Sequence, residues 1–457
     1  MTSLPSSSSH TPKLWRVGTL TYTSGGLILL FCWLLWGDFA WSMRDRCVPS
    51  AVQLLFKRFG ASDTLVGLLC SSLPGGIGLI LGPIIGYKSD RLRSRWGRRI
   101  PFLAIPTPFI VLSMVGLVFA PQIGAFAHHL LGSPAWGLDS TVLIFMAVFW
   151  TAFELSCVSA NSVFGALIND VVPQAVIGRF FGLFRALSLI AGMLLNYWIM
   201  GKIETRYASI FLGVGLLYGV GFTLMCLKVK EGAYPPPPPL LPGKAGSAWA
   251  SVCDYFRDGF AKPYYLLFFG TTIFLFASTG PFNLYAVFYA QSLGLSLDAY
   301  FKCIAIMYGV SLVIAYPLGA LVDRFHPLRV SLAVLALYGC VMGWGMLYVK
   351  NAASFTVVLM LHTVISGTLF TVAASLGQRL LPQSKFAEIS SAGGILGSLF
   401  GMAFAPAMGA FLDRSHHDYR YVFHAGFGLA ILGLILGIAL YRRFLALGGP
   451  KNYHAPE

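Results

Sequence analysis

Long apolar runs, separated by short polar or Pro/Gly-rich breaks, fill most of the chain. They form two sets, one on each side of a polar stretch at residues 230–262. The first set covers 24–57, 64–88, 100–121, 141–169, 176–201 and 207–228, and the second covers 263–291, 299–321, 328–348, 354–378, 386–411 and 420–441. An α-helix needs about 20 apolar residues to cross the hydrocarbon layer of a membrane. The pattern therefore predicts twelve membrane-spanning helices in two groups of six.

The composition supports the same fold class, an all-α polytopic membrane protein. Of the 457 residues, 56% are hydrophobic and 11% are charged, whereas roughly a quarter of the residues in a soluble domain are charged. This excludes a water-soluble globular protein. We expect five parts: an N-terminal tail (1–23), a six-helix bundle (24–229), a linker (230–262), a second six-helix bundle (263–444) and a C-terminal tail (445–457). The linker contains Pro235–Pro239, which favours a semi-rigid polyproline segment.

The net charge of +15 arises from 32 Lys and Arg against 17 Asp and Glu. In the twelve-helix arrangement, most of the basic residues fall in the tails, the linker and the even-numbered loops. Basic residues stay on the cytoplasmic side of inserted helices. We therefore expect a multi-pass protein of the plasma (inner) membrane with both termini in the cytoplasm. The positive charge reports orientation and does not indicate a nucleic-acid partner.

The sequence predicts no enzyme, cofactor or metal site. Five of the eight Cys lie in apolar runs without CxxC spacing, which argues against a disulfide framework or a zinc site. No motif pairs a nucleophile with a base, and none forms the phosphate loop of an ATP-driven pump. The Ser-rich start of the chain lacks an apolar core before the first long run, so we expect no cleaved signal peptide.

The two sets of spans share a motif. The pattern G-x-x-x-D-R ends the second and the eighth predicted spans, at Gly86–Arg91 and at Gly319–Arg324. Its recurrence at equivalent junctions indicates a six-helix repeat. We expect charged residues near these junctions to gate the protein by exchanging ion-pair partners, the alternative being that they serve topology alone. These gating candidates are Asp90, Arg91, Arg98, Arg99, Asp323 and Arg324.

The residues around the first motif carry a family resemblance. Pro83–Arg91, followed by Ser94–Phe102, resembles the loop signature of the major facilitator superfamily, and in detail the branch of plant sucrose transporters and their animal relatives. Phe39–Trp41 and Pro49–Leu55 are similar to the first helix of that branch. The resemblance implies the major facilitator fold, two pseudo-symmetric six-helix bundles, and proton-coupled symport of a sucrose- or maltose-like sugar.

A more distant likeness is to melibiose-permease-type sugar:cation symporters of the glycoside-pentoside-hexuronide group. In that family an acidic residue in helix 1, a polar residue in helix 4 and an Arg in helix 5 hold the sugar. The likeness implies these roles for Asp38, Asn161 and Arg185. The helix-2 aspartates that bind sodium there are replaced here by the uncharged stretch Gly78–Gly82. This difference favours protons over sodium as the coupling ion.

Charged side chains inside a span are costly and are functional candidates by default. The predicted spans contain Asp38, Arg44, Asp45, Arg46, Glu154 and Arg185, with His362 and His424 as further titratable groups. We expect Asp38, Asp45 or Glu154 to carry the coupled proton. Two alternatives stay open: the charges at 44–46 simply end the first span, and Arg185 forms a structural ion pair with Asp38 or Glu154.

Sugar recognition needs several hydrogen-bonding groups together with aromatic faces that cover the apolar side of a pyranose. The substrate-binding candidates are Asp38, Trp41, Arg44, Asn161, Phe164, Arg185, Asn283 and Tyr285. We expect a monomeric secondary transporter whose partners are a small sugar, a proton and the lipid bilayer. The alternatives are an exporter, a carrier of another polar solute, and a non-transporting membrane sensor with the same fold.

Overall fold

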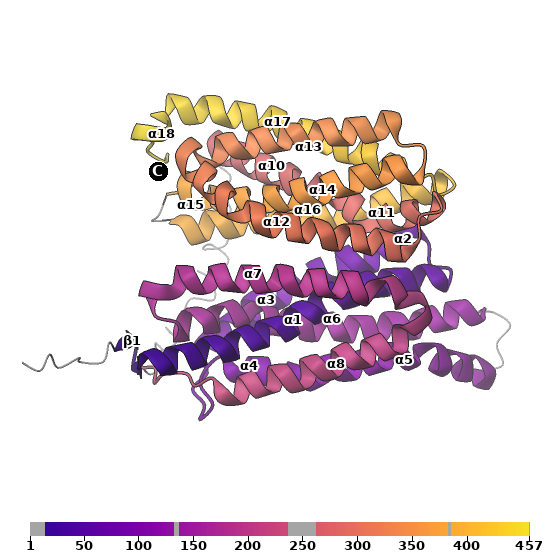
Figure 1. The fold of residues 1–457 in the computed structure, drawn as a ribbon, viewed down its shortest axis with the longest axis horizontal. Coiled ribbons are helices and arrows are strands. Elements are labelled where there is room, and N and C mark those ends of the chain that lie inside the picture. Colours follow the sequence, from indigo (N-terminus) through magenta and orange to yellow (C-terminus); the bar gives the residue numbers. More distant parts are fainter. Residues whose placement is uncertain (1–13, 132–136, 236–261, 383–384, 457) are drawn as a thin grey trace, which may run out of the picture.

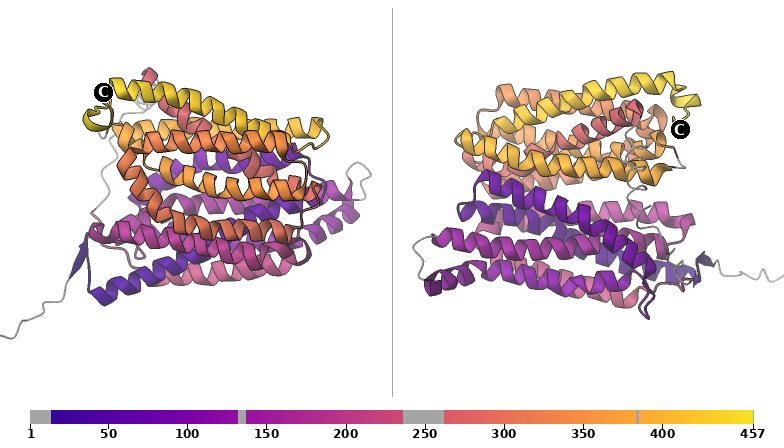
Figure 2. Two further views of the ribbon diagram at one scale, coloured as in Figure 1. Left: turned by 45° about the horizontal axis from the view of Figure 1, so that its top comes forward. Right: turned by 180° about the vertical axis from the view of Figure 1, so that it is seen from behind.

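The computed structural model describes residues 14–131, 137–235, 262–382 and 385–456. Long helices lie side by side in two bundles, one from indigo to pink and the other from orange to yellow (Figure 1; Figure 2). A short hairpin, β1 (Trp15–Val17) and β2 (Leu20–Tyr22), precedes the first bundle. The C-terminus and this hairpin lie at the same end of the molecule (Figure 1), which we call the terminal end. We call the opposite end the distal end.

The helices of the N-terminal bundle follow one another up and down between these two ends. They are α1 (Ser24–Arg58), α2 (Asp63–Gly67), the π-helix η1 (Leu68–Ser72), α3 (Leu73–Arg91), α4 (Ile100–Ala104), α5 (Pro106–Leu131), α6 (Leu138–Val171), α7 (Gln174–Trp198), the 3₁₀-helix η2 (Met200–Lys202) and α8 (Ile203–Lys228).

The C-terminal bundle repeats this path. Its helices are α10 (Pro263–Ala277), α11 (Gly280–Ser292), α12 (Leu297–Phe325), α13 (Pro327–Tyr348), α14 (Ala352–Ala373), α15 (Leu376–Leu380), α16 (Phe386–Arg414), α17 (Tyr421–Ala446) and α18 (Gly449–Asn452).

In the part of the chain that the structure describes, eleven continuous helical runs are long and apolar enough to cross a membrane. One of them, Gln174–Lys228, has 55 residues and consists of α7 and α8, which are each long enough to cross alone. Twelve crossings result, as the hydrophobic pattern predicts. The protein is an all-α, multi-pass membrane protein.

The first helix settles one of the open alternatives. α1 begins at a Thr23 cap, whose side chain accepts a hydrogen bond from the Gly26 N–H, and continues without a break for 35 residues. It passes through Pro49 and ends at Arg58. The charges at positions 44–46 therefore lie inside the span and do not end it.

The seventh crossing is broken in its middle. α10 ends at Ala277 and α11 begins at Gly280, with Pro281 in its first turn. Proline is tolerated there because the first turn of a helix leaves its N–H groups without intrahelical partners. The break places Asn283 in the first turn of a new helix, next to exposed backbone groups. Such broken helices are common at the binding sites of transporters.

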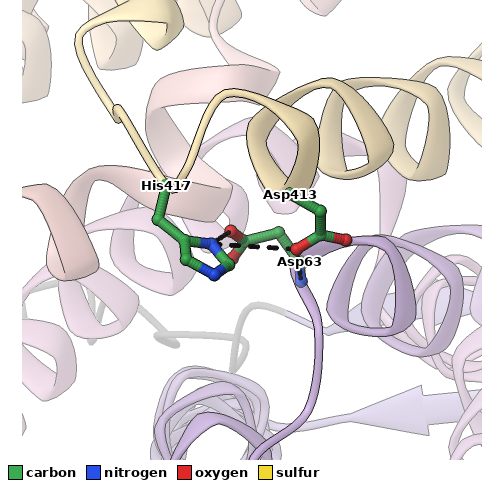
Figure 3. A group of neighbouring side chains, drawn as sticks. All are labelled: Asp63, Asp413 and His417. Atoms are coloured by element: carbon green, nitrogen blue, oxygen red, sulfur yellow. Dashed lines mark hydrogen bonds and ion pairs between the residues drawn. The ribbon is translucent and has the colours of Figure 1, made fainter.

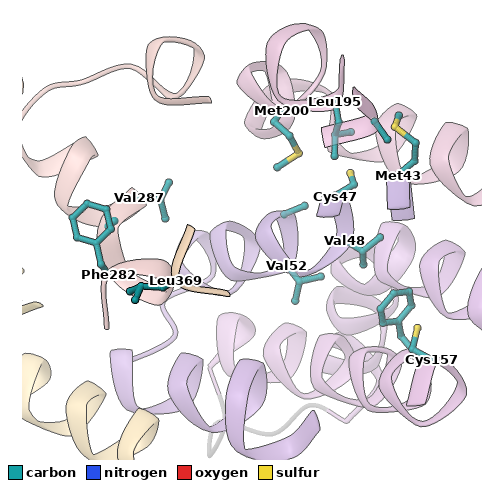
Figure 4. Packing of buried hydrophobic residues seen from close by; sticks show 14 of the residues in the cluster. Met43, Cys47, Val48, Val52, Cys157, Leu195, Met200, Phe282, Val287 and Leu369 are labelled. Carbon is teal, nitrogen blue, oxygen red and sulfur yellow. The ribbon is translucent and has the colours of Figure 1, made fainter. Parts of the chain in front are cut away.

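The buried apolar core runs through both bundles. Figure 4 shows Met43, Cys47, Val48 and Val52 on α1, together with members of the same cluster from other helices. The labelled members from elsewhere are Cys157, Leu195, Met200, Phe282, Val287 and Leu369. α1 therefore lies at the centre of the molecule, where its charged face reaches the space between the bundles.

The predicted linker is anchored where the structure describes it. Glu231 accepts hydrogen bonds from the backbone N–H groups of Arg98, Arg99 and Ile100, at 3.0, 2.8 and 2.8 Å. These N–H groups are the free donors at the start of α4, where negative charge is favourable. The rest of the predicted polyproline segment, from Pro236 onward, lies outside the described residues.

Candidate functional site: a polar cavity between the bundles

A cavity of about 540 Å³ lies between the two bundles. This volume is within the range of about 300–1,000 Å³ that is typical of small-molecule sites. The N-terminal wall carries Asp45, Arg46, Ser50, Gln53, Arg185 and Asn196. The C-terminal wall carries Asn283, Tyr300, Tyr308, Ser311, His362, Thr363 and Ser366, with the aromatic rings of Phe282, Phe301 and Phe370. The cavity thus combines hydrogen-bonding groups with aromatic surface.

The charged groups on the cavity wall come from α1 and α7. Arg46 donates a hydrogen bond to the Ser188 hydroxyl at 3.0 Å, and its guanidinium lies 4.9 Å from the ring centroid of Tyr308 on α12. Asp45 and Arg185 are exposed to the cavity. Of the substrate-binding candidates, Arg185 and Asn283 line the cavity. Asp45 is the only proton-coupling candidate among its lining residues.

Asp38 lies behind this wall. It is 1% exposed, and its Oδ2 has no hydrogen-bond partner in the structure. Ser42 and Arg46 follow at intervals of four residues, so all three share one face of α1. A buried carboxylate without a partner is costly when it is charged. The site therefore favours a neutral carboxyl or a transient ion partner, and Arg46 is the nearest cation along that face.

Arg44 is enclosed within the N-terminal bundle, away from the cavity. It is fully buried, and its guanidinium lies 4.3 Å from the ring centroid of Trp41 and 4.9 Å from that of Tyr218. One of its nitrogens contacts Cys157 Sγ at 3.1 Å and another contacts Asp45 Oδ1 at 3.4 Å. The aromatic rings and sulfur replace water around the cation.

Three predicted sugar ligands therefore form a packed cluster. Trp41 stacks on Phe164 with centroids 5.1 Å apart and lies against the Arg44 guanidinium, and neither ring is among the residues that line the cavity. Glu154, buried to 9% exposure, lies three residues before Cys157 on the same helix face. Asn161 is exposed on α6 but does not line the cavity. In this conformation Trp41, Arg44, Asn161 and Phe164 thus lie outside the lining of the cavity.

At the distal end, the two bundles are joined by a group that we call the distal cluster: Lys57, Asp63, Thr64, Asp413, His417 and Tyr419. Asp413 accepts hydrogen bonds from the N–H groups of Asp63 and Thr64 at 2.7 and 2.9 Å. It therefore caps the start of α2 from the other bundle. Asp63, fully buried, contacts His417 at 2.6 Å (Figure 3) and Lys57 at 2.8 Å.

The backbones approach closely beside this cluster. A side chain at Gly409 would collide with the backbone of Asp63, and one at Gly67 would collide with the Ala405 carbonyl. Tyr285, a substrate-binding candidate, donates a hydrogen bond to the Asp63 carbonyl at 3.1 Å or to that of Ala405 at 3.2 Å. Tyr285 is thus part of the distal contact in this conformation. The distal end of the cavity is closed by these contacts.

The distal cluster also brings three possible metal ligands within 4.8 Å of one another, from Asp63, Asp413 and His417. The ammonium of Lys57 and the hydroxyl of Tyr419 already contact the Asp63 carboxylate. These partners compensate its negative charge within the protein. The distal cluster is therefore an ion-pair and hydrogen-bond network.

At the terminal end, the predicted gating residues of the first motif form a network within the N-terminal bundle. Asp170 accepts two hydrogen bonds from Arg98, at 2.7 and 3.0 Å, and one from Arg99 at 3.1 Å. Arg99 also pairs with Asp90 at 2.5 Å, and the guanidinium of Arg91 lies 5.4 Å from the Tyr87 ring centroid. In the repeat, Arg324 is exposed beside Phe325, and the side chain of Asp323 lies outside the described residues.

Several functional residues were not predicted. Tyr300 and Tyr308 line the cavity, and Asp63, Asp413 and His417 join the bundles. In the sequence, the last three occur in short polar breaks and resemble ordinary loop residues. The sequence identifies Arg46 as an intramembrane charge, but it does not distinguish Arg46 from its charged neighbours Asp45 and Arg44. The rotation of α1 about its axis alone decides that Arg44 is buried and that Asp45 and Arg46 face the cavity.

Comparison with known proteins agrees with this architecture. Residues 34–401 match the Major Facilitator Superfamily model, so the chain belongs to this family. Membership of this family makes it a membrane transporter and not an enzyme.

Curated relatives match over shorter segments. The chain is 31% identical over 150 residues to the human "Proton-associated sugar transporter A", covering 32% of this chain and 19% of that protein. It is 30% identical over 89 residues to the rice (Oryza sativa subsp. japonica) "Sucrose transport protein SUT1", covering 19% of this chain and 15% of that protein. The matched segments thus span less than a fifth of either relative.

Solved structures resemble the whole chain in fold. A bacterial homologue of the human lysosomal transporter Spinster, in an inward-facing and unoccupied conformation, has a TM-score of 0.64 at 14% identity, covering 95% of this chain and 100% of that chain. A D-xylose-proton symporter has a TM-score of 0.61 at 16% identity, covering 91% and 97%. These likenesses support the major facilitator fold.

Proposed function

We propose that the protein is a secondary active transporter that carries a sugar together with protons by alternating access. The observation that carries the proposal is the 540 Å³ cavity, whose charged wall comes from one bundle and whose neutral polar wall comes from the other. A ligand bound between them contacts both bundles at once. It can therefore favour one relative arrangement of the bundles over another.

A sugar fits the chemistry of this cavity. Its hydroxyl groups need donors and acceptors on several sides, and the wall residues supply guanidinium, carboxylate, amide and hydroxyl groups. The rings of Tyr308 and Phe370, which are the more exposed aromatic groups of the lining, offer surface for the C–H groups of a pyranose. Sugar transport by two relatives that share part of this sequence supports the same substrate class.

Asp38 is the proposed site of the coupled proton. The carboxyl is buried and one of its oxygens has no hydrogen-bond partner, which favours the protonated form. Arg46, on the same face of α1, offers an ion partner when the proton leaves. The same Arg46 contacts Tyr308 across the cavity. When Asp38 loses its proton, its carboxylate therefore competes with Tyr308 for Arg46. The proton thus affects a contact between the bundles, and coupling requires such a difference in interaction between two conformations.

Because the distal cluster joins the two bundles, we infer that the transporter is closed at its distal end in this conformation. With both termini in the cytoplasm, as the distribution of basic residues indicates, this state would present the cavity toward the cytoplasm. Opening the distal end requires that Asp413 release the start of α2 and that Asp63 release His417. Sugar and proton bound together would have to stabilise the intermediate in which both ends are closed.

The test uses purified protein in proteoliposomes. Uptake of radiolabelled sucrose, maltose and glucose is measured with and without an inward-directed proton gradient. We expect the gradient to drive accumulation of at least one sugar. The Asp38→Asn variant should lose accumulation but keep sugar exchange at equal pH. Asp139→Asn, an exposed position at the start of α6, is the matched control. Accumulation by Asp38→Asn would remove this residue from coupling, and absence of all sugar uptake would contradict the proposed substrate class.

A further inference from the structure

A histidine is built into the C-terminal wall of the cavity. His362 on α14 is 3% exposed, and both of its ring nitrogens have partners. Nε2 lies 2.9 Å from Asn283 Oδ1, and Nδ1 lies 3.0 Å from the Tyr338 hydroxyl. Asn283 itself is exposed to the cavity. A chain of hydrogen bonds thus runs from the bundle interior, through the imidazole, to an amide on the cavity surface.

The partners determine the direction of these hydrogen bonds. The Tyr338 hydroxyl has a single proton and lies nearer to His362 Nδ1, at 3.0 Å, than to the Ser278 carbonyl, at 3.4 Å. The shorter distance favours donation from Tyr338 to Nδ1, and the Asn283 oxygen at Nε2 favours the same tautomer because it can only accept. In a neutral imidazole the proton is then on Nε2, which donates to the Asn283 carbonyl oxygen. The Asn283 amide nitrogen, with two N–H donors, is left to face the cavity.

The surroundings of His362 oppose a positive charge. The Phe282 ring lies against the imidazole, with centroids 4.2 Å apart, and the polar partners Tyr338 and Asn283 are neutral. The charged groups on the cavity wall are Asp45, Arg46 and Arg185, so cations outnumber anions. Protonation of Nδ1 would also leave the Tyr338 hydroxyl only the more distant Ser278 carbonyl, at 3.4 Å, as its acceptor.

We propose that His362 is a positioning residue that holds the Asn283 amide with its N–H donors toward the substrate. This inference rests on the proposed sugar transport and specifies one contact of that site. The substrate must place an oxygen acceptor, a hydroxyl or an ether oxygen, against Asn283. His362 stays neutral during transport and does not carry the coupled proton, in contrast to the role proposed for Asp38 in the opposite bundle.

The broken seventh helix explains why this support is needed. Asn283 lies in the first turn of α11, directly after the break at Ser278 and Thr279. Its own backbone N–H donates to the Thr279 carbonyl at 3.0 Å. A side chain at the end of a helix has fewer neighbours than one in its middle. The hydrogen bond from His362 fixes its rotation, so that the amide does not present its oxygen instead.

Uptake kinetics test the positioning role, with whichever of sucrose, maltose and glucose gives the largest uptake. His362→Leu should raise KM about three- to tenfold, because one neutral hydrogen bond to the sugar is lost, with little change in the maximal rate. His362→Gln keeps a donor toward Asn283 and should restore part of the affinity. The pH profile of uptake should be unchanged in both. Tyr338→Phe, which conserves packing, should raise KM about twofold.

Coupling between the two residues is measured directly. If His362 acts through Asn283, the KM of the double variant His362→Leu with Asn283→Leu should equal that of Asn283→Leu alone. Independent, additive effects would overturn the proposal, as would an unchanged KM in a folded His362→Leu protein. Deoxy and O-methyl analogues of the same sugar give a second criterion. An O-methyl group at the contacted position should be recognised better than a deoxy carbon, since only the former accepts a hydrogen bond.

A spectroscopic measurement separates this proposal from the proposed function. Protein labelled with ¹⁵N-histidine and compared with His362→Gln should show one buried, neutral imidazole with its proton on Nε2 from pH 8 to pH 5. Titration of this signal within that range, or a proton on Nδ1, would overturn the inference without any sugar present. Absence of sugar uptake together with the expected spectrum would contradict the substrate class and leave the arrangement of His362 and Asn283 established.

Discussion

The two bundles follow the same helical plan but handle charge in different ways. On the cavity wall, the Asp and Arg residues all come from the N-terminal bundle: Asp45, Arg46 and Arg185. The C-terminal wall is polar but carries no acidic or Lys/Arg side chain among its lining residues, and its central group is the pair His362 and Asn283. In the proposed mechanism the charged N-terminal wall thus serves both proton coupling and sugar binding, whereas the neutral C-terminal wall serves sugar binding alone.

The terminal end repeats this difference. In the N-terminal bundle, the junction after α3 is held by the ion pairs of Arg98 and Arg99 with Asp170. In the C-terminal bundle, the turn after α12 contains His326 with φ of 74°, stacked on Phe444 at a centroid distance of 4.7 Å. Burial, together with Arg379 and Arg329, lowers the pKa of His326 to about 4. The shared motif is therefore followed by the ion pairs of Asp170 in the N-terminal bundle and by a turn with a partly buried histidine in the C-terminal bundle.

The largest effect should follow removal of a charge from the N-terminal wall. Arg185→Gln should raise the KM for sugar uptake at least about tenfold, since hydrogen bonds to charged groups contribute about 1.5–3 kcal/mol. Arg179→Gln, one and a half turns earlier on α7 and exposed, is the control. An effect no larger than that of Asn283→Leu would break the distinction between the two walls.

Loss of the shared counter-ion at the terminal end should have the next largest effect. Asp170→Asn leaves two guanidinium groups without their common acceptor and should lower the free energy of unfolding by about 1.5–3 kcal/mol. Thermal unfolding in detergent measures this change. Asp298→Asn removes an exposed pair with Lys302 on α12 and should cost about 0.5 kcal/mol or less. Equal losses in the two variants would contradict the ionic role assigned to the N-terminal junction.

Opening of the distal end should be easier when Asp413 no longer caps α2. Asp413→Asn should shift the equilibrium toward the distally open state by about 1 kcal/mol, the usual value of a helix cap. Labelling of a cysteine at Gln53, in a background lacking the exposed native cysteines, reports access to the cavity from the distal side. Asp418→Asn, in the same turn and paired with Arg420, is the control. Faster labelling in the control alone would show that the distal cluster does not close the cavity.

The smallest effect should follow replacement of His326, in the turn after α12 of the C-terminal bundle. Because the pKa of His326 is lowered to about 4 in the folded protein, against about 6.5 in the unfolded chain, its stabilising contribution is full above pH 6.5. It is lost as the pH falls toward 4. His326→Asn tolerates the positive φ and should make stability less sensitive to acid.

The measurement is the thermal midpoint at pH 7.5 and pH 4.5. We expect the difference between the two midpoints to shrink by about 1 °C or less, because solvent screening of this partly exposed histidine keeps the change below about 1 kcal/mol and the chain is long. His454→Asn, exposed near the C-terminus, should leave the difference unchanged. A larger difference in His326→Asn would mean that the histidine is charged in the folded protein.

The helical architecture could be predicted well from the sequence. Apolar runs above the length of a membrane crossing define a helix almost wherever they occur, since every backbone group in lipid must find a partner within its own segment. The predicted ends agree with the structure to within a few residues for most helices, for example 328–348 against Pro327–Tyr348. The prediction was wrong for the end of the third span: α5 continues through Pro121 to Leu131, against a predicted end at 121, because the residues after this proline are still mostly apolar and it does not end the helix.

The candidate site could be predicted only in part. Arg185 and Asn283 face the cavity as expected, while Trp41, Arg44 and Phe164 pack inside the N-terminal bundle. Residues 44, 45 and 46 are all charged, but consecutive residues on a helix point about 100° apart. Rotation of α1 is set by packing against its neighbours, and no feature of the local sequence determines it.

The sequence by itself determined the class of the protein: its hydrophobic periodicity, its sparse intramembrane charge and the motif at Gly86–Arg91 lead to a twelve-helix transporter. Tertiary structure alone decided which charges meet. The contacts of Asp63 with His417 and of His362 with Asn283 join residues far apart in the chain, at separations of 354 and 79. Such pairings depend on how helices turn and pack against one another, and a single sequence carries no local signal for that.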